Sequence, residues 1–369
     1  MMKENQYNIS PYLRLARTAR RAYFFIDYLD DKIVSMNQED YNFLSKFVLG
    51  DNPKHKDGVN RQEYLGYLAE SNFLIDRKKI EHIHRLRRVE IETSTICNWR
   101  CQYCPAAEKK RPVKVMTMDL FEKILDLCKE YKTIKTVCIH AYCEPSVDPF
   151  FLERVKMIEK KGFYFELFTN GSNLSVDKIN QLAASGNVKK VVFNFPSAVE
   201  DEFCRMTGSN QFKQVQKNIS IAIKRKLPVY ITVLSKEGTA SPKVVKMFPG
   251  AYVDGLKVQD RAATLKNKEY SCNVKMEDAK LYGCFYFFQI LYINSDGICF
   301  PCINDCLGLN YAYGNIQDCC SIDELMTNDK IRQLRRKIFG LEPVDSNFIC
   351  KRCVFMKKNK QEFISTWMV

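Results

Sequence analysis

The chain reads Thr95-Ile-Cys-Asn-Trp-Arg-Cys-Gln-Tyr-Cys-Pro105 at the point that decides its fold, with three and then two residues between successive cysteines. One short loop can therefore place the thiolates of Cys97, Cys101 and Cys104 around a single inorganic centre. A cubane iron–sulfur cluster has four irons and usually takes four cysteine thiolates. With three thiolates, one iron would keep an open position, which distinguishes a catalytic metal site from a closed structural one.

Two simpler interpretations of this loop stay open. Structural zinc would need a fourth ligand nearby, and the loop contains none of the four histidines of the chain, His55, His82, His84 and His140. Plain buried thiols are the other alternative, whereas disulfides are not expected in a chain without an export signal.

The spacing, with Tyr103 directly before the last cysteine, resembles the signature of the radical S-adenosylmethionine (radical SAM) superfamily. The resemblance implies that the three cysteines bind a 4Fe–4S cluster, whose open iron the amino and carboxylate groups of SAM chelate, and that Tyr103 belongs to the cofactor site. In that family the reduced cluster cleaves SAM, and a 5′-deoxyadenosyl radical removes hydrogen from the substrate. An external electron donor such as flavodoxin or ferredoxin is also implied.

Composition sets the class of protein. The 369 residues suggest two or three domains, and 46% apolar with 27% charged residues is typical of a globular chain. The first residues show no secretory signal, and no apolar run is long enough to span a bilayer, so we expect a cytoplasmic protein without a membrane partner. Sixteen cysteines then favour metal or redox chemistry over disulfides. A net charge of +14 favours an acidic partner or simply a basic surface.

Residues 88–261 alternate short β-branched runs with amphipathic helical patterns, which predicts parallel strands joined by crossover helices. The expected strands are Val89–Thr93, Thr136–Ala141, Tyr164–Thr169, Lys190–Phe195, Val229–Leu234 and Leu256–Gln259. The expected helices are one starting after Thr117, Leu152–Lys161, Asp177–Ser185, Phe212–Lys226 and Pro242–Phe248. Six such units resemble the partial (β/α)6, TIM-like barrel of the radical SAM family, an α/β fold.

The C-terminal ends of such strands carry the chemistry of a barrel. The second strand ends in Ala141-Tyr-Cys-Glu-Pro145, which resembles the Gly-Gly-Glu-Pro motif of the family, and this implies that Glu144 binds the SAM amino group. Cys143 stands where the family normally has glycine. It is a candidate catalytic thiol near the radical, or an inert small residue that reshapes the pocket.

Polar residues also follow the third and fourth strands. Relatives often carry a polar residue toward the ribose after the fourth strand, and Phe193-Asn-Phe-Pro-Ser197 offers Asn194 and Ser197 for that role. The third strand ends in Phe168-Thr-Asn-Gly-Ser172, where Asn170 is either a cofactor ligand or a turn former with Gly171.

Nine cysteines follow the barrel, and residues 293–302 predict a hairpin with an Asp-Gly turn. This order resembles the twitch/SPASM extension of radical enzymes. The resemblance implies an auxiliary 4Fe–4S cluster held by Cys284, Cys302, Cys350 and Cys353. The spare thiols could hold a second auxiliary cluster or replace Cys302, and they are Cys299, Cys306, Cys319 and Cys320. A zinc ribbon on the hairpin and the terminal Cys-x-x-Cys pair is the alternative.

The N-terminal region predicts a hairpin over Tyr23–Met36, a helix capped by Asn37, a loop over Asp51–Gly58, a second helix over Arg61–Glu70 and an apolar strand at Phe73–Ile75. This order resembles the winged-helix-like element with which peptide-modifying radical enzymes bind the leader of a precursor. A domain that only covers the barrel is the alternative. A nucleic-acid partner is not expected, because the segment lacks a basic recognition helix.

The sequence therefore predicts a winged-helix-like domain (1–85), a radical SAM partial barrel (86–265) and a cysteine-rich twitch/SPASM-like domain (266–369). The favoured function is a radical SAM peptide maturase that acts on a precursor peptide. A dehydrogenase or related enzyme of a small molecule, such as an amino sugar, is the second hypothesis. A non-catalytic iron–sulfur protein is the third, and Glu144 beside an open cluster argues against it.

Overall fold

The computed structural model describes residues 7–18, 21–49, 61–108, 111–235, 239–257, 281, 283–353 and 364–367. The expected loop Asp51–Gly58 and Cys272 lie outside these residues. Contacts divide the chain into two compact units. Unit 1 comprises Met1–Arg85, Val274–Gln289 and Met326–Val369, and unit 2 comprises Leu86–Asn273 and Ile290–Leu325. The division into three consecutive domains stays a prediction.

Unit 2 is built on six parallel strands that lie in chain order, which confirms the expected α/β class. They are β6 (Arg88–Ile91), β7 (Thr136–Ile139), β8 (Tyr164–Thr169), β9 (Val188–Asn194), β10 (Val229–Ser235) and β11 (Tyr252–Lys257). The sixth strand starts at Tyr252, four residues before the expected Leu256, and Val258 and Gln259 lie outside the described residues. Asp254 and Gly255 interrupt its apolar residues, so the sequence marks its start only weakly.

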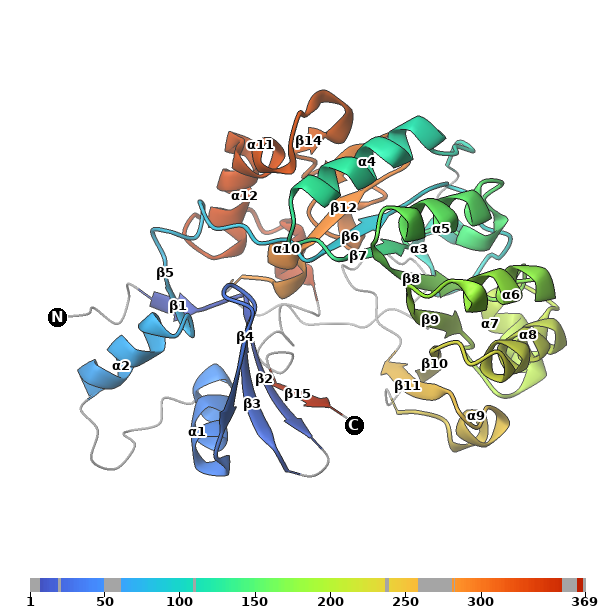
Figure 1. Cartoon of the computed structure of the whole chain (residues 1–369), viewed down its shortest axis with the longest axis horizontal. Helices are drawn as coiled ribbons and strands as arrows, with labels where there is room; N and C mark the ends of the chain where they lie inside the picture. Colours follow the sequence, from blue (N-terminus) through green and yellow to red (C-terminus); the bar gives the residue numbers. More distant parts are fainter. Residues whose placement is uncertain are drawn as a thin grey trace. The chain divides into compact units, whose positions relative to one another are not determined.

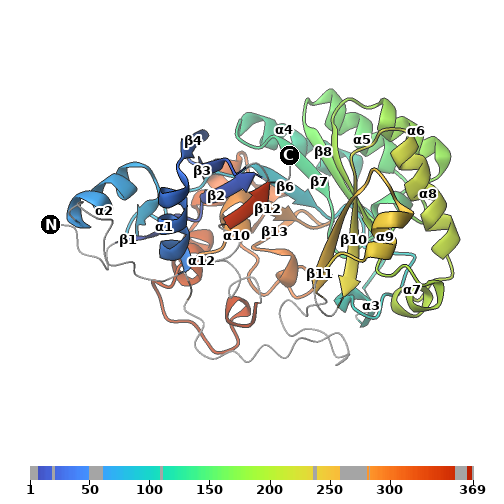
Figure 2. The ribbon, with the colours of Figure 1, turned by 90° about the horizontal axis from the view of Figure 1, so that it is seen from below.

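Helices α4 (Met118–Glu130), α5 (Phe151–Lys160), α6 (Val176–Ala184) and α8 (Phe212–Lys224) flank one face of these strands (Figures 1 and 2). The other helices between the strands are α3 (Pro105–Glu108), α7 (Glu200–Thr207) and α9 (Pro242–Met247), with the 3-10 turn η2 (Pro145–Val147). Thr117 caps α4 by accepting a hydrogen bond from the Leu120 amide at 3.2 Å. The sequence did not predict α7, whose first turn consists of three acidic residues and which buries only a few side chains.

The expected hairpin is present and joins the same sheet. β12 (Ile290–Ile293) pairs antiparallel with β13 (Ile298–Phe300), which pairs in turn with β14 (Gly314–Asn315). β12 also pairs in parallel with β6, so nine described strands form one sheet. Gly297 takes a φ of 82° at the turn, a conformation that glycine adopts without strain. The 3-10 turns η3 (Ile303–Asp305) and η4 (Ile316–Asp318) and helix α11 (Ile322–Thr327) complete this part.

Unit 1 contains a four-stranded sheet in the order β15-β2-β3-β4. Its strands are β2 (Leu13–Thr18), β3 (Tyr23–Asp27), β4 (Lys32–Met36) and β15 (Ile364–Trp367). The predicted hairpin is therefore the β3–β4 pair, and Asn37 caps the following helix by accepting from the Asp40 amide at 2.8 Å. The sequence predicted neither β2 nor the parallel pairing of β15 with it.

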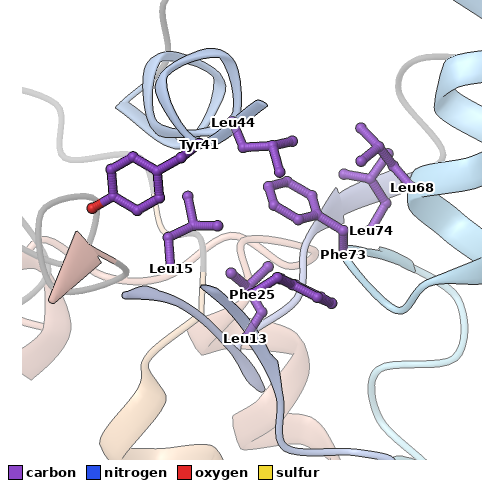
Figure 3. Packing of buried hydrophobic residues seen from close by; sticks show 8 residues of the cluster. All are labelled: Leu13, Leu15, Phe25, Tyr41, Leu44, Leu68, Phe73 and Leu74. Carbon is purple, nitrogen blue, oxygen red and sulfur yellow. The ribbon is translucent and has the colours of Figure 1, made fainter. Parts of the chain in front are cut away.

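The remaining elements of unit 1 are β1 (Tyr7–Ile9), α1 (Gln38–Leu49), α2 (Arg61–Glu70), β5 (Leu74–Asp76), α10 (Phe285–Gln289), α12 (Asp329–Ile338) and the 3-10 turn η5 (Ile349–Arg352). The expected bounds of α2 agree with the structure. Eight buried side chains from the sheet, from α1 and α2, and from the chain at the start of β5 form the core that Figure 3 shows. They are Leu13, Leu15, Phe25, Tyr41, Leu44, Leu68, Phe73 and Leu74. No helix in the described part of the chain is both long and apolar enough to cross a membrane.

Candidate functional site

The cysteine loop follows β6 and is fastened by its backbone to the end of α7. The Arg100 amide donates to the Thr207 carbonyl at 3.2 Å, and the Gln102 amide donates to the Met206 carbonyl at 2.9 Å. Gly208 ends α7 with a φ of 66°, and a Cβ there would lie 3.0 Å from the Arg100 carbonyl oxygen. Glycine at this position therefore permits the close approach of α7 to the loop.

Trp99 anchors the loop inside unit 2. Its side chain is only 2% exposed, and its indole Nε1 donates to Gln211 Oε1 at 2.9 Å. Its ring packs edge-on against the ring of Phe203, with 5.4 Å between the ring centroids. Neither Trp99 nor Gln211 is among the site residues predicted from the sequence. A large aromatic residue between two expected metal ligands was the available signal.

The three thiols of the loop interact electrostatically with one another. Burial raises the pKa of Cys97 to about 11 and also raises the pKa values of Cys101 and Cys104. Buried thiolates therefore need a compensating cation. No group of three His, Cys, Asp or Glu side chains converges on a single-ion site within the described ranges. A cubane places its thiolates on different irons, so three thiols around one loop fit such a cluster.

Glu144 lies beside this loop. Its backbone amide donates to the Ile96 carbonyl at 2.8 Å, and its carboxylate interacts electrostatically with the Cys97 thiol. The carboxylate is buried and hydrogen-bonded, with Oε1 accepting from the Ser146 amide at 3.0 Å and the Thr169 hydroxyl at 2.6 Å. Oε2 accepts from the Asn170 amide at 2.6 Å. Burial raises the pKa of Glu144, and these hydrogen bonds oppose that shift.

The Asn170 side chain connects the β8 loop to the cysteine loop. Its Oδ1 accepts from the Ser172 amide at 2.9 Å, as in a side-chain turn, and Gly171 follows with a φ of 76°. Its Nδ2 donates to Asn98 Oδ1 at 2.9 Å, and Asn98 in turn donates to the Ser172 hydroxyl at 2.8 Å. Asn98, which was also not predicted from the sequence, thus helps to fix the loop around Cys97.

Asn194 and Ser197, the two residues predicted to face the ribose, have different hydrogen-bond partners. Asn194 Nδ2 donates to the Tyr103 hydroxyl at 2.6 Å, and that hydroxyl is hydrogen-bonded to the Cys101 thiol. The Ser197 hydroxyl accepts from the Val199 amide at 3.0 Å and donates to Glu202 Oε2 at 2.5 Å, at the start of α7. Asn194 therefore contacts the cysteine loop. Ser197 is hydrogen-bonded at the start of α7, the helix whose other end contacts that loop.

Cys143 has an acidic and thiol-rich environment. It interacts electrostatically with Glu92, Glu144, Cys97 and Cys306, and burial raises its pKa. Glu92 is itself buried and forms a two-point ion pair with Arg111, at 2.8 and 2.5 Å. The Cys306 thiol is hydrogen-bonded to the same Glu92 carboxylate. Neither Glu92 nor Arg111 was predicted from the sequence as a site residue.

Polar side chains of β6 and β8 form a row with His140, which directly follows β7. Arg88 contacts Glu166 at 2.6 Å and Glu90 at 3.0 Å, and His140 Nδ1 lies 3.1 Å from Glu90 Oε2. The centroids of the His140 and Phe168 rings lie 4.4 Å apart. Alternate residues of a strand point to opposite faces, and the residues between these polar ones are fully buried. The strands that lead to the cysteine loop and to Glu144 thus carry charges of both signs.

Most of the described cysteines after the barrel lie in or beside short helical turns, and Cys299 lies in β13. Cys284 directly precedes α10, Cys302 caps η3, and Cys350 and Cys353 are buried at η5. Among the alternative ligands, Cys299 is buried with its thiol 3.7 Å from the Gly297 carbonyl, and the Cys319 thiol lies 3.3 Å from the Asn315 carbonyl. Cys306 is buried against Glu92, and Cys320 is exposed.

Part of the chain matches a known protein family. Residues 91–240 match the family described as the Radical SAM superfamily. The tungsten-containing aldehyde ferredoxin oxidoreductase cofactor-modifying protein of Pyrococcus furiosus is 31% identical over 101 residues, which cover 27% of this chain and 28% of the relative. The chain is matched over less than half the length of its curated relatives.

Two solved structures share the fold. SuiB of Streptococcus suis bound to precursor peptide SuiA has a TM-score of 0.58 and 15% identity, covering 95% of this chain and 94% of that one. BtrN in complex with AdoMet and 2-DOIA has a TM-score of 0.52 and 18% identity, and the match covers 73% of this chain and 93% of that one. Together with the cysteine loop at the end of the first parallel strand, these matches confirm the resemblance read from the sequence: the chain carries a radical SAM domain, which residues 91–240 identify.

Proposed function

We propose that this protein is a radical SAM enzyme that cleaves SAM reductively and removes a hydrogen atom from a precursor peptide. A 4Fe–4S cluster with bound SAM supplies the 5′-deoxyadenosyl radical in this chemistry. Cys97, Cys101 and Cys104 would hold that cluster, and an external flavodoxin or ferredoxin would reduce it. The observation that carries the proposal is the three-thiol loop fastened beside the buried carboxylate of Glu144.

Glu144 is suited to bind the SAM amino group. Among the described residues, its Oε2 accepts one hydrogen bond, from the Asn170 amide. A carboxylate oxygen has two lone pairs, so Oε2 keeps one acceptor site for an ammonium group. Burial strengthens such a charge-assisted contact. Thr169 and Ser146 hold the other oxygen and thereby orient the carboxylate.

A peptide substrate is supported by the sheet of unit 1. β15 occupies one edge of this sheet, and β4 forms the other edge among the described strands. β4 exposes two large apolar side chains, Ile33 at 62% and Val34 at 46%. An exposed apolar edge strand can bind an extended peptide by backbone pairing. The fold likeness to SuiB covers 95% of this chain, so it must include most of residues 1–85.

A small-molecule substrate is the second candidate, and the fold likeness to BtrN motivates it. That likeness covers a smaller share of this chain than the likeness to SuiB. Modification of a candidate precursor peptide, measured by mass spectrometry, separates the two functions. The same enzyme preparation supplied with an amino sugar is the parallel assay.

The reaction type is tested with the full-length chain reconstituted anaerobically with iron and sulfide. After reduction with dithionite, it should release 5′-deoxyadenosine from SAM. A variant with Cys97, Cys101 and Cys104 replaced by alanine should not, because no thiolate remains in the loop to hold the cluster. Equal release from both proteins would contradict the proposal. The exposed Cys320→Ala variant is a control for the loss of a thiol as such.

We also propose an auxiliary 4Fe–4S cluster on Cys284, Cys302, Cys350 and Cys353. The reconstituted chain should then contain about eight irons, and the variant without the loop cysteines about four. Cys302→Ala should lose auxiliary iron, whereas Cys299→Ala should keep it, because the Cys299 thiol is buried against the turn of its own hairpin. About twelve irons in the unsubstituted chain would instead indicate a second auxiliary cluster.

A further inference from the structure

Tyr103 stands between an amide and a cluster ligand. Asn194 Nδ2 donates to the Tyr103 hydroxyl oxygen at 2.6 Å, and the same hydroxyl is hydrogen-bonded to Cys101. A phenol has one hydrogen to donate, and an amide NH2 can only donate. Asn194 thus donates to the phenol oxygen, and in the hydrogen bond with Cys101 the phenol is the donor.

The phenol is held in this position from two further sides. The Tyr103 side chain packs against Met206, and Leu234 packs against the same methionine. Met206 belongs to α7, and its carbonyl accepts the amide hydrogen of Gln102, the residue next to Tyr103. Asn194 is the last residue of β9, a strand paired on both sides in the sheet. The donor therefore has a fixed direction, which a surface tyrosine lacks.

We propose that Tyr103 is a positioning residue that donates a hydrogen bond to the Cys101 sulfur and so raises the reduction potential of the cluster at this loop, with Asn194 orienting the phenol. This inference rests on the cluster proposed above. Reduction adds negative charge to a cluster and its thiolates, and a donor aimed at a ligand sulfur stabilises the reduced state more than the oxidised state. Tyr103 thus has an electrostatic role in this chain, through its hydroxyl group.

The test is a redox titration of the reconstituted full-length chain, followed by the EPR signal that added SAM perturbs. Tyr103→Phe keeps the ring and removes the donor. At a fixed potential, we expect its ratio of reduced to oxidised cluster to be about tenfold lower, which for a one-electron couple is about 59 mV. Asn194→Ala should shift the ratio in the same direction by less, because the phenol is then free to turn. Tyr164→Phe is the matched control, since Tyr164 is 46% exposed at the start of β8.

The outcomes separate this inference from the proposed function. If the unsubstituted chain forms no cluster that SAM perturbs, the proposed function fails, and this inference fails with it. If the cluster forms but Tyr103→Phe titrates like the Tyr164→Phe control, the inference alone is overturned. If the Tyr103→Phe variant does not retain iron, the reduction potential of the Asn194→Ala variant tests the inference instead. A shift to lower potential in that variant supports the hydrogen bond, and an unchanged potential overturns it.

Discussion

Ala141 has a φ of 122°, in a region that glycine favours and L-residues rarely adopt. It follows β7 and opens the loop that carries Cys143 and Glu144. The backbone there must turn sharply to bring the Glu144 amide to the Ile96 carbonyl, at 2.8 Å. A methyl group at position 141 therefore adds strain in the loop that carries Glu144, where a glycine would add none.

Replacing Ala141 by glycine should stabilise the protein by about 1 kcal/mol, because it relieves this strain. The measurement is the midpoint of denaturant unfolding. Ala183→Gly in α6 is the matched control, because Ala183 lies in a regular helix, where glycine costs about 1 kcal/mol. If both substitutions destabilise the protein to the same extent, Ala141 is not strained.

At the scale of single elements, α5 depends on a buried charge. The side chains of Arg154 and Asp148 are both 0% exposed, and Arg154 Nε donates to Asp148 Oδ2 at 2.9 Å. A second Arg154 nitrogen donates to the Met116 carbonyl, and the guanidinium lies 4.8 Å from the Phe121 ring centroid. This arginine thus connects α5, the chain before α4, and α4 itself.

Arg154→Leu should destabilise the protein by about 3–5 kcal/mol, because it leaves the Asp148 charge buried and unpaired. Arg154→Leu combined with Asp148→Asn should recover a large part of this loss, since the unpaired charge is then absent. Denaturant unfolding of both single variants and the double variant gives the coupling free energy. A double variant as unstable as the sum of the single ones would show that the pair contributes through packing alone.

At the scale of the whole molecule, the proposed peptide docking at β4 can be tested without deleting the N-terminal region. Deletion of residues 1–85 would remove packing partners of later segments of unit 1. Gln289 Nε2 donates to the Pro11 carbonyl at 3.0 Å. The rings of Tyr12 and Phe288 pack edge-on, with 5.8 Å between their centroids. A substitution on the exposed edge is therefore a sharper experiment than a truncation.

Val34→Asp should weaken the binding of a precursor peptide at least tenfold, by removing an apolar contact from the edge strand. Its effect on stability should stay within about 0.5 kcal/mol, because the side chain is half exposed. Val176→Asp is the control, with 44% exposure on α6 against 46% for Val34. Fluorescence anisotropy of a labelled leader peptide gives both affinities, and binding should weaken as salt rises if the leader is acidic. Equal affinities for the two variants would place the peptide elsewhere.

Local patterns determined much of this protein from sequence alone. The spacing of Cys97, Cys101 and Cys104 needs only a short loop, and the apolar periodicity of α4 needs only its own residues, so both could be read directly. The hairpin of β12 and β13 and the Asn37 cap are equally local. In each case the signal and the structure that it specifies lie within a few turns of chain.

Only the tertiary structure determined which distant groups meet. Trp99 and Gln211 are 112 positions apart, and Tyr103 and Asn194 are 91 apart. Such pairs leave no periodic pattern, because a hydrogen bond between remote residues depends on where the strands end. The pairing of β15 with β2 has the same cause, since a four-residue strand gains its stability from the edge that it joins. The sequence thus determined the kind of centre that the loop can hold, and the packing of α7, β8 and β9 around that loop determined its surroundings.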